Sequence, residues 1–219
     1  LVDARIPFSS KNPDIAKMTE NKPKFIVLNK SDLSDPEQNK KWLEYYKSTG
    51  YTAVLFDSKT KNRAAAVSDI MKKITAVFSE KAQRNAEKGM RGRSLKIMVT
   101  GIPNVGKSTF INSFAGKACA KTGNKPGVTK GNQWIRLNKG LELLDTPGIL
   151  WPKFEDQTVG LKPLIGSIND QILNKDDLAC QCIRILKERY PGMVTQRFGL
   201  ETEDKEPVAI LEDVARQRS

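Results

Sequence analysis

A glycine-containing segment that ends in a lysine and a hydroxyl is the clearest chemical signal in the chain. Residues 101–108 read GIPNVGKS, which fits G-x-x-x-x-G-K-[ST] between a predicted strand and a predicted helix. In such a loop the backbone N–H groups surround a phosphate, Lys107 neutralises the β- and γ-phosphates, and the Ser108 hydroxyl ligates Mg²⁺. The nucleotide-binding residues expected from this segment are Asn104, Val105, Gly106, Lys107, Ser108 and Thr109.

Two later segments supply groups that a triphosphate and its metal require. Residues 143–148 read LLDTPG, so Asp145 follows a strand and is expected to hold Mg²⁺ through water, while the Gly148 N–H senses the γ-phosphate. Residues 126–129 read PGVT, and Thr129 is expected to close on Mg²⁺ only when the γ-phosphate is present. We therefore expect Lys107, Thr129 and Gly148 to act in catalysis, and Ser108, Thr129 and Asp145 to hold the metal.

A tetrapeptide near the beginning of the chain indicates which base is bound. Residues 29–32 read NKSD directly after the apolar run 25–28. The Asp32 carboxylate can accept two hydrogen bonds from the guanine N1–H and 2-amino groups, an edge that adenine does not offer. Asn29 would tie the loop together, and the aliphatic stem of Lys30 would lie on the base plane. Ser58, in the DSK of residues 57–59, is a weaker match to a loop that approaches guanine O6.

A second N-K-x-D occurs at residues 174–177, where it would follow the phosphate loop rather than precede it. Only 29 residues separate it from Asp145, whereas the conventional path needs two crossovers of roughly 30 residues each. The preceding segment, 167–171, is also too polar to be a buried strand. We interpret Asn174 as a helix cap, so that the guanine motif precedes the phosphate loop and the motif order is permuted.

The surrounding pattern alternates strands and helices, which favours an α/β fold with a mostly parallel sheet flanked by helices. Residues 61–94 provide the connection that a permuted order needs. From about residue 165 the pattern becomes helical. We predict a P-loop GTPase domain over residues 1–164 and an incomplete, all-helical C-terminal domain over 165–219. Since the chain begins with Leu1 inside a strand-like pattern, we expect it to be a fragment.

Composition and charge narrow the classes of protein further. With 38% hydrophobic and 28% charged residues, the 219-residue chain is of the globular class, without a visible signal peptide or membrane span. The net charge of +12 favours a polyanionic partner, although a solvated basic face, including the stretch 81–93, remains an alternative. Because there is no histidine and the three cysteines form no CxxC, zinc is not expected. These features favour a cytoplasmic protein.

Taken together, the motifs resemble those of the circularly permuted GTPases that act in ribosome assembly. The resemblance covers about three quarters of the chain and is carried by residues 3–7 (DARIP), 29–32, 101–109, 122–129 (TGNKPGVT) and 144–154 (LDTPGILWPKF). It implies GTP and GDP binding with Mg²⁺, GTP hydrolysis, and a role in late maturation of the large ribosomal subunit with contacts to its precursor and rRNA. It also implies a K⁺ site at Asn104 in some members. No membrane partner is expected, and a monomer is favoured although the sequence does not determine the oligomeric state.

Ile149 stands where Ras-like enzymes carry the glutamine that orients water, and an aliphatic side chain cannot make that hydrogen bond. The resembling proteins are thought to use a histidine from an N-terminal segment, so slow hydrolysis without the ribosomal particle is expected. Two other functions stay open on the sequence alone. One is a GTP-dependent RNA-binding assembly factor in which hydrolysis is incidental, and the other is a GTPase that acts on tRNA or a membrane surface.

Overall fold

The computed structural model describes residues 1–20, 22–58, 60, 62–87, 94–120, 131–137, 141–148 and 174–218. The chain divides into two compact units, residues 1–168 and 169–219, which are described separately. The strands of the first unit are β1 (Val2–Asp3), β2 (Phe25–Asn29), β3 (Thr52–Phe56), β4 (Leu95–Val99), β5 (Gln133–Leu137) and β6 (Leu141–Asp145). Its helices are α1 (Pro13–Met18), α2 (Pro36–Ser48), α3 (Arg63–Glu87) and α4 (Lys107–Ala115), with a short 3₁₀ turn η1 (Ser31–Leu33).

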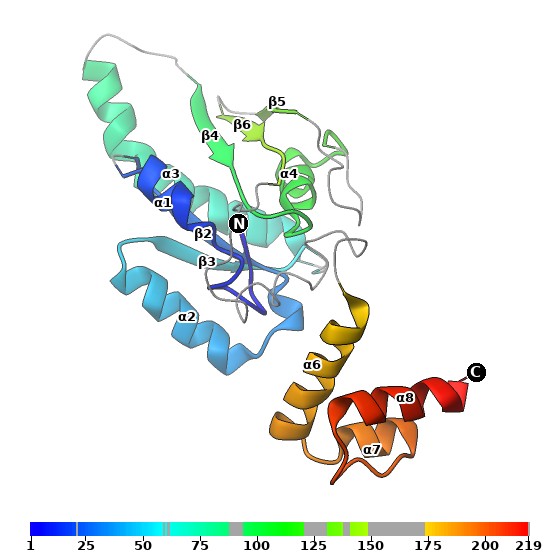
Figure 1. Cartoon of the computed structure of the whole chain (residues 1–219). Coiled ribbons are helices and arrows are strands. Elements are labelled where there is room, and N and C mark those ends of the chain that lie inside the picture. The colour runs from blue at the N-terminus through cyan, green and yellow to red at the C-terminus, as the bar shows by residue number, and fades with distance from the viewer. Residues whose placement is uncertain are drawn as a thin grey trace. The chain divides into compact units, whose positions relative to one another are not determined.

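The described strands form two three-stranded sheets. The first has the order β1-β2-β3 with all strands parallel, and the second has the order β4-β6-β5, in which β4 and β6 are parallel and β5 is antiparallel. Leu1, which precedes β1, contacts Thr100, which follows β4: the Leu1 nitrogen donates to the Thr100 carbonyl at 2.7 Å. The predicted α/β fold with a mostly parallel sheet is confirmed (Figure 1), and β5 and β6 form its antiparallel pair.

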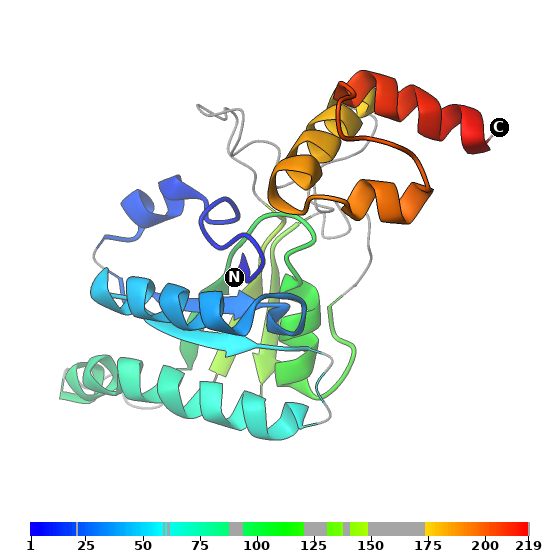
Figure 2. The same cartoon turned by 90° about the horizontal axis from the view of Figure 1, so that it is seen from below.

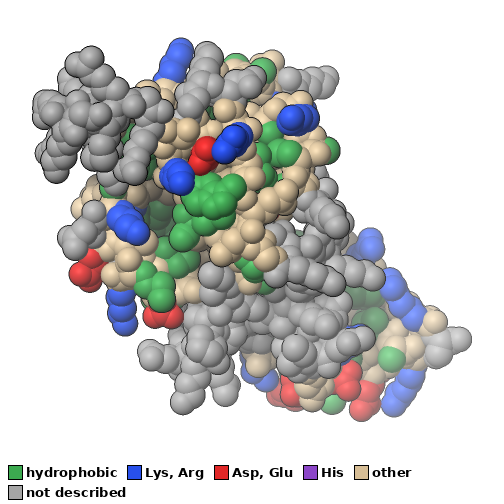
Figure 3. Space-filling view, turned by 90° about the horizontal axis from the view of Figure 1, so that it is seen from above, with side chains coloured by type: hydrophobic (Ala, Val, Ile, Leu, Met, Phe, Trp, Pro, Cys, Tyr) green, Lys and Arg blue, Asp and Glu red, His purple; other side chains and the backbone are tan. Residues whose placement is uncertain are grey.

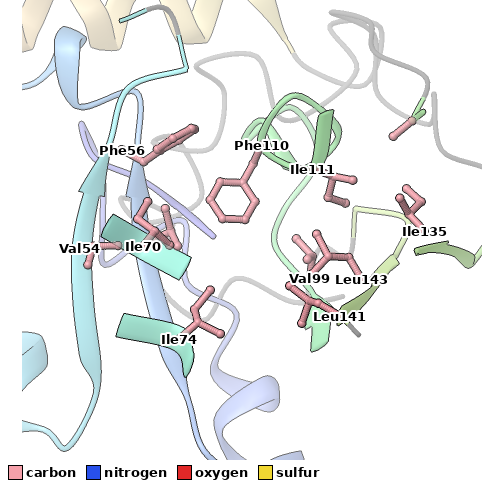
Figure 4. Close-up of a cluster of buried hydrophobic side chains, with 12 residues drawn as sticks. Val54, Phe56, Ile70, Ile74, Val99, Phe110, Ile111, Ile135, Leu141 and Leu143 are labelled. Atoms are coloured by element: carbon pink, nitrogen blue, oxygen red, sulfur yellow. The ribbon is translucent and has the colours of Figure 1, made fainter. Parts of the chain in front are cut away.

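Helices cover the first sheet on both faces, with α2 on one side and α3 on the other (Figure 2). On the α2 side, Tyr46 packs with apolar residues of β1, β2 and β3, and its hydroxyl donates to the Pro7 carbonyl at 3.1 Å. On the other side a larger cluster joins α3 and α4 to strands of both sheets (Figure 4). Its labelled members are Val54, Phe56, Ile70, Ile74, Val99, Phe110, Ile111, Ile135, Leu141 and Leu143. The shared core makes the two sheets parts of one folded unit.

The helix α3 is the long connection that the permuted order requires. Val67, Ile70, Met71 and Ile74 recur at helical spacing and pack against the core, as the sequence pattern predicts. The helix continues to Glu87 and thus leads from β3 toward β4. The side chains of the basic stretch 81–93 lie outside the described part of the chain.

The second unit contains three described helices, α6 (Lys175–Arg189), α7 (Met193–Phe198) and α8 (Pro207–Arg218). Ile183, Val194 and Ile210 form its buried centre, one from each helix. The sequence pattern predicts α6 and α8 but a polar loop where α7 is found. It also assigns Cys182 and Ile185 to the buried face of α6, whereas both are exposed. Among the described residues, no helix is both long and apolar enough to span a bilayer.

Candidate nucleotide and metal site

The G-x-x-x-x-G-K-S segment lies between β4 and α4, as predicted. Gly106 is the N-cap of α4 with φ of +97°, a conformation that glycine adopts without cost, and Asn104 also has a positive φ of +55°. The N-terminal N–H groups of α4 and the loop together form the kind of environment that binds an anion. Val105 is buried, whereas Thr109 is exposed on the first turn of α4.

Lys107 folds back over this loop. Its ammonium donates to the carbonyls of Gly101 and Ile102, both at 3.0 Å, and only 6% of the residue is exposed. Burial lowers the pKa of Lys107 to about 8, against the opposing effect of the Asp145 charge. A phosphate beside this ammonium would favour its charged form, so the environment suits an anion.

The NKSD tetrapeptide is held against the phosphate loop although more than seventy residues separate them. Asn29 ends β2, is 1% exposed, and donates from Nδ2 to the Val105 carbonyl at 2.7 Å. Lys30 has a left-handed φ of +60° and donates to the Asn104 carbonyl at 2.8 Å. At Gly106 any Cβ would collide with the Asn29 amide nitrogen, so the close approach requires glycine there. These two hydrogen bonds hold the NKSD segment against the phosphate loop.

The other two residues predicted to contact the guanine base, Asp32 and Ser58, lie at the same edge of the sheet. Asp32 lies in η1, two residues after Lys30, and is exposed. Ser58 follows the end of β3, where Phe56 pairs in register with Asn29 of the parallel β2. Because the carboxyl ends of parallel strands meet at one edge, the Ser58 segment emerges beside the Asn29 segment.

Asp145 ends β6 and lies beside the start of α4. Its Oδ2 accepts a hydrogen bond from the Ser108 hydroxyl at 3.3 Å. Asp145 is only 1% exposed, yet its buried Oδ1 has no hydrogen-bond partner among the described residues. Burial raises the pKa of Asp145, while the Ser108 hydrogen bond and the Lys107 charge oppose that rise.

A hard divalent cation would suit these oxygen atoms. Mg²⁺ is commonly bound by one or two protein oxygens together with substrate phosphates and water, so a carboxylate and a hydroxyl on adjacent loops are sufficient. An unpaired buried carboxylate oxygen is also costly without a cation or donor. In the part of the chain that is described, no three acidic, histidine or cysteine side chains gather as a metal site by themselves. The residues present therefore fit Mg²⁺ bound jointly with a nucleotide.

Gly148 packs directly on the phosphate loop. A Cβ there would lie 2.6 Å from both the N and Cα of Pro103, which leaves space only for glycine. The structure thus brings together three predicted segments: 101–109, 29–32 and 145–148. Two predicted positions, Thr129 and Ile149, lie outside the described residues.

The competing N-K-x-D in the second unit serves as a helix cap. The Asn174 Oδ1 accepts from the backbone N–H groups of Asp176 and Asp177 at 3.1 and 3.5 Å, and α6 follows at once. A capping amide stabilises the first turn of a helix. The interpretation of this segment as a cap is confirmed.

One group in contact with the site received no chemical role from the sequence. Asp3, which is 4% exposed at the end of β1, lies 3.1 Å from the Lys30 ammonium and also pairs with Arg5. The signal that could have found it is the strand register, because β1 places Asp3 opposite Asn29. A short strand of two residues gives too little pattern to predict that register.

Comparison with known proteins agrees with this geometry. The family model described as "50S ribosome-binding GTPase" matches residues 96–213. The ribosome biogenesis GTPase A proteins of Priestia megaterium and Bacillus cereus are 44% and 42% identical to this chain; all of the chain aligns with 75% and 73% of those proteins. The Mitochondrial ribosome-associated GTPase 1 of Ictalurus punctatus is 32% identical over 97% of the chain and 68% of its own length.

Solved structures share the fold. The GDP-bound YlqF structure has a TM-score of 0.60 at 23% identity, covering 99% of this chain and 88% of that one. The GNP-bound YlqF of T. maritima has a TM-score of 0.56 at 24% identity, covering 99% and 86%. Since the family model matches more than half of the chain and two curated relatives exceed 40% identity, the chain belongs to the 50S ribosome-binding GTPases, within the ribosome biogenesis GTPase A family.

Proposed function

We propose that this chain binds GTP with Mg²⁺, hydrolyses it to GDP and phosphate, and uses the nucleotide state to control its docking on a precursor of the large ribosomal subunit. The observation that supports this most strongly is the pair of hydrogen bonds from Asn29 and Lys30 to the phosphate loop, at 2.7 and 2.8 Å. They bring a guanine-type N-K-x-D loop to the loop that would hold the phosphates. A kinase that shared only the phosphate loop would have no use for this arrangement.

The roles within the site follow from the positions of the side chains. Asp32 would accept the two guanine hydrogen bonds, and the stem of Lys30 would cover one face of the base. The Lys107 ammonium would leave the Gly101 and Ile102 carbonyls for the β- and γ-phosphates, which are stronger acceptors. Ser58 would contribute beside guanine O6, and the N–H groups of residues 104–109 would hold the phosphates.

Mg²⁺ would neutralise charge on the β- and γ-phosphates as the bond between them breaks. Ser108 would bind it directly and Asp145 through water, while Thr129 would complete its coordination. The Gly148 N–H would donate to a γ-phosphate oxygen. In this proposal Asn104 also provides the position for K⁺, a refinement supported only by the resemblance.

Hydrolysis is proposed to be slow in the isolated chain. The residue after Gly148 is Ile149, whose side chain cannot orient a water molecule by hydrogen bonding. The group that orients the water would be supplied by the ribosomal particle. The role of the particle is supported by the names of the relatives, which refer to ribosome biogenesis and ribosome association.

An RNA-containing partner suits the charge of the protein. The net charge is +12, and Figure 3 shows Lys and Arg side chains scattered on the described surface with Asp and Glu side chains among them. A positive net charge raises the rate of association with a polyanion. A bacterial large-subunit precursor would place the protein, acting as a monomer, in the cytoplasm.

Steady-state GTP turnover with and without large-subunit precursor particles tests the proposal. We expect a slow basal rate and strong stimulation by the particles, lost in Lys107→Ala and retained in Lys117→Ala, which changes an exposed lysine beyond α4. Particle binding that depends on GTP but leaves turnover unstimulated would favour the RNA-binding factor with incidental hydrolysis. Stimulation by tRNA or anionic vesicles instead of the particles would identify a different partner.

A further inference from the structure

A buried carboxylate lies behind the proposed base-binding loop, on a strand with no assigned part in nucleotide binding. Asp3 ends β1 and pairs in register with Asn29 at the end of β2. Asp3 is 4% exposed, so its carboxylate is shielded from bulk water. Buried carboxylates are uncommon unless their charge is paired.

Two cations pair with this carboxylate. Arg5 donates from Nε to Oδ1 at 2.9 Å and from Nη2 to Oδ2 at 2.7 Å, a bidentate arrangement. The Lys30 ammonium lies 3.1 Å from Oδ2. Burial by itself would raise the pKa of Asp3, but the Arg5 hydrogen bonds and the Lys30 charge hold that pKa below its ordinary value. The carboxylate is therefore ionised at neutral pH.

The contact with Lys30 matters because the same ammonium donates to the Asn104 carbonyl at 2.8 Å. Lys30 is thus held at one side by β1 and at the other by the phosphate loop. Its backbone is in the left-handed region, which is an uncommon conformation for lysine. A side chain fixed at both its backbone and its ammonium has little rotational freedom left to lose when a ligand binds.

The segment around Asp3 is itself held by hydrogen bonds. The Asp3 N–H donates to the Ser10 hydroxyl oxygen at 2.9 Å, and the Ser10 hydroxyl lies 2.8 Å from the Ile6 carbonyl. Farther along the same segment, the buried Tyr46 hydroxyl donates to the Pro7 carbonyl. Hydrogen bonds within residues 3–10 and from Tyr46 of α2 therefore brace this segment.

Arg5 extends the network toward the residue expected to read the base. Its hydrogen bond to Asp3 raises the pKa of Arg5 against its own partial burial, and the negative charges of Asp3 and Asp32 raise it further. Arg5 is thus within electrostatic reach of both carboxylates. The positive charge of Arg5 therefore favours the ionised form of both carboxylates.

We propose that Asp3 is a positioning residue for guanine recognition: together with Arg5 it fixes Lys30, whose stem covers the base, in the orientation that the purine requires. This inference rests on the proposed function. It assigns Asp3 no contact with the nucleotide. Loss of its charge should weaken binding of the base and leave the phosphate site intact.

The test is isothermal titration of the whole chain with Mg·GDP and, separately, with Mg·pyrophosphate. Asp3→Asn is expected to weaken GDP binding about tenfold, in line with loss of one charge-assisted hydrogen bond, and to change pyrophosphate affinity less than about twofold. The matched control is Asp69→Asn, which also removes a carboxylate 2.7 Å from a lysine but on the exposed face of α3. It should leave both affinities unchanged.

A double-mutant cycle separates positioning from general support. If Asp3 acts through Lys30, adding Asp3→Asn to Lys30→Ala should weaken GDP binding no further than Lys30→Ala alone. Independent, additive losses would overturn the inference, as would an equal loss of GDP and pyrophosphate affinity or an unchanged GDP affinity in Asp3→Asn.

Asp3→Asn leaves two cations beside an uncharged amide and could destabilise the fold, so a second variant that keeps the charge serves as a control. Asp3→Glu keeps the charge and displaces it by one methylene; the ratio of GDP to pyrophosphate affinity should fall, but less than in Asp3→Asn, and an unchanged ratio would overturn the inference. If the unaltered chain bound pyrophosphate but showed no preference for guanine nucleotides, the proposed function itself would fail, which is a separate outcome.

Discussion

Replacing Gly148 with alanine tests how closely the segment after β6 must approach the phosphate loop. A Cβ at this position would lie 2.6 Å from the Pro103 N and Cα and 2.7 Å from its Cγ. Ordinary contacts of a Cβ begin near 3.4 Å, so the two loops must separate by about 0.8 Å to accept one methyl group. Two of the three colliding atoms belong to the backbone, which cannot avoid the methyl by a change of rotamer.

The phosphate loop is anchored by side-chain hydrogen bonds from the NKSD segment. Asn29 and Lys30 both donate to its carbonyls, and Gly106 is packed against the Asn29 amide. We therefore expect the Gly148 segment to move, which carries its N–H away from the γ-phosphate. Overpacking of this kind costs about 1–3 kcal/mol. If that cost falls on the GTP state alone, GTP affinity drops about 5- to 150-fold.

The assay compares Kd for a nonhydrolysable GTP analogue with Kd for GDP, both with Mg²⁺. GDP has no γ-phosphate, so its affinity should change less than about twofold. Gly131→Ala is the control, because a Cβ there meets no atom within 4 Å. Equal losses for both nucleotides would refute the role given to the Gly148 N–H, and full retention of both affinities would refute the packing argument itself.

Three further outcomes are expected. Lys107→Ala should abolish measurable nucleotide binding by titration while the exposed Lys117→Ala leaves it intact; unchanged binding would remove the phosphate-loop assignment. Asp32→Asn should shift preference from guanosine to xanthosine nucleotides, at a cost of about 1.5–3 kcal/mol per charged hydrogen bond lost to GTP, and retained GTP preference would place the base elsewhere. Because the pKa of Asp3 is lowered in the folded protein, its charge stabilises the fold at neutral pH, and this stabilisation is lost as pH falls below about 4. The free energy of unfolding, measured by chemical denaturation, should therefore fall less steeply with acid in Asp3→Asn than in the unaltered protein. Equal pH dependence in the two proteins would contradict this expectation.

The parts of the site that sequence could predict are those whose chemistry is local. The residues of the phosphate loop are consecutive, and strand, loop and helix follow one another directly, so residues 101–108 are recognisable without knowledge of the fold. The same holds for Asp145, which ends an apolar strand, and for Asn174, whose capping role needs only the first turn of its own helix. Each of these patterns is complete within a few residues.

Other features depend on pairing between distant segments and are not visible in the sequence. The role of Asp3 follows from a two-residue strand whose register places it beside Asn29. In the second unit, α7 has six residues, too few to display a helical period clearly. On α6 the buried side chain is Ile183, whereas the sequence pattern favours Cys182 and Ile185, because with apolar residues on several sides the partner helices decide which face is buried.

Permutation of the motif order does not weaken the site, because the contacts that assemble it are not between neighbours in the chain. Asn29 reaches Val105 and Lys30 reaches Asn104 across 76 and 74 residues. Such contacts depend on where β2 and β4 lie in the fold and not on which comes first. What permutation requires is a connection from β3 to β4, and α3 supplies one that also buries Ile70 and Ile74 in the shared core. The linking segment therefore contributes to stability, and the order of the motifs can change while the geometry between base loop and phosphate loop is retained.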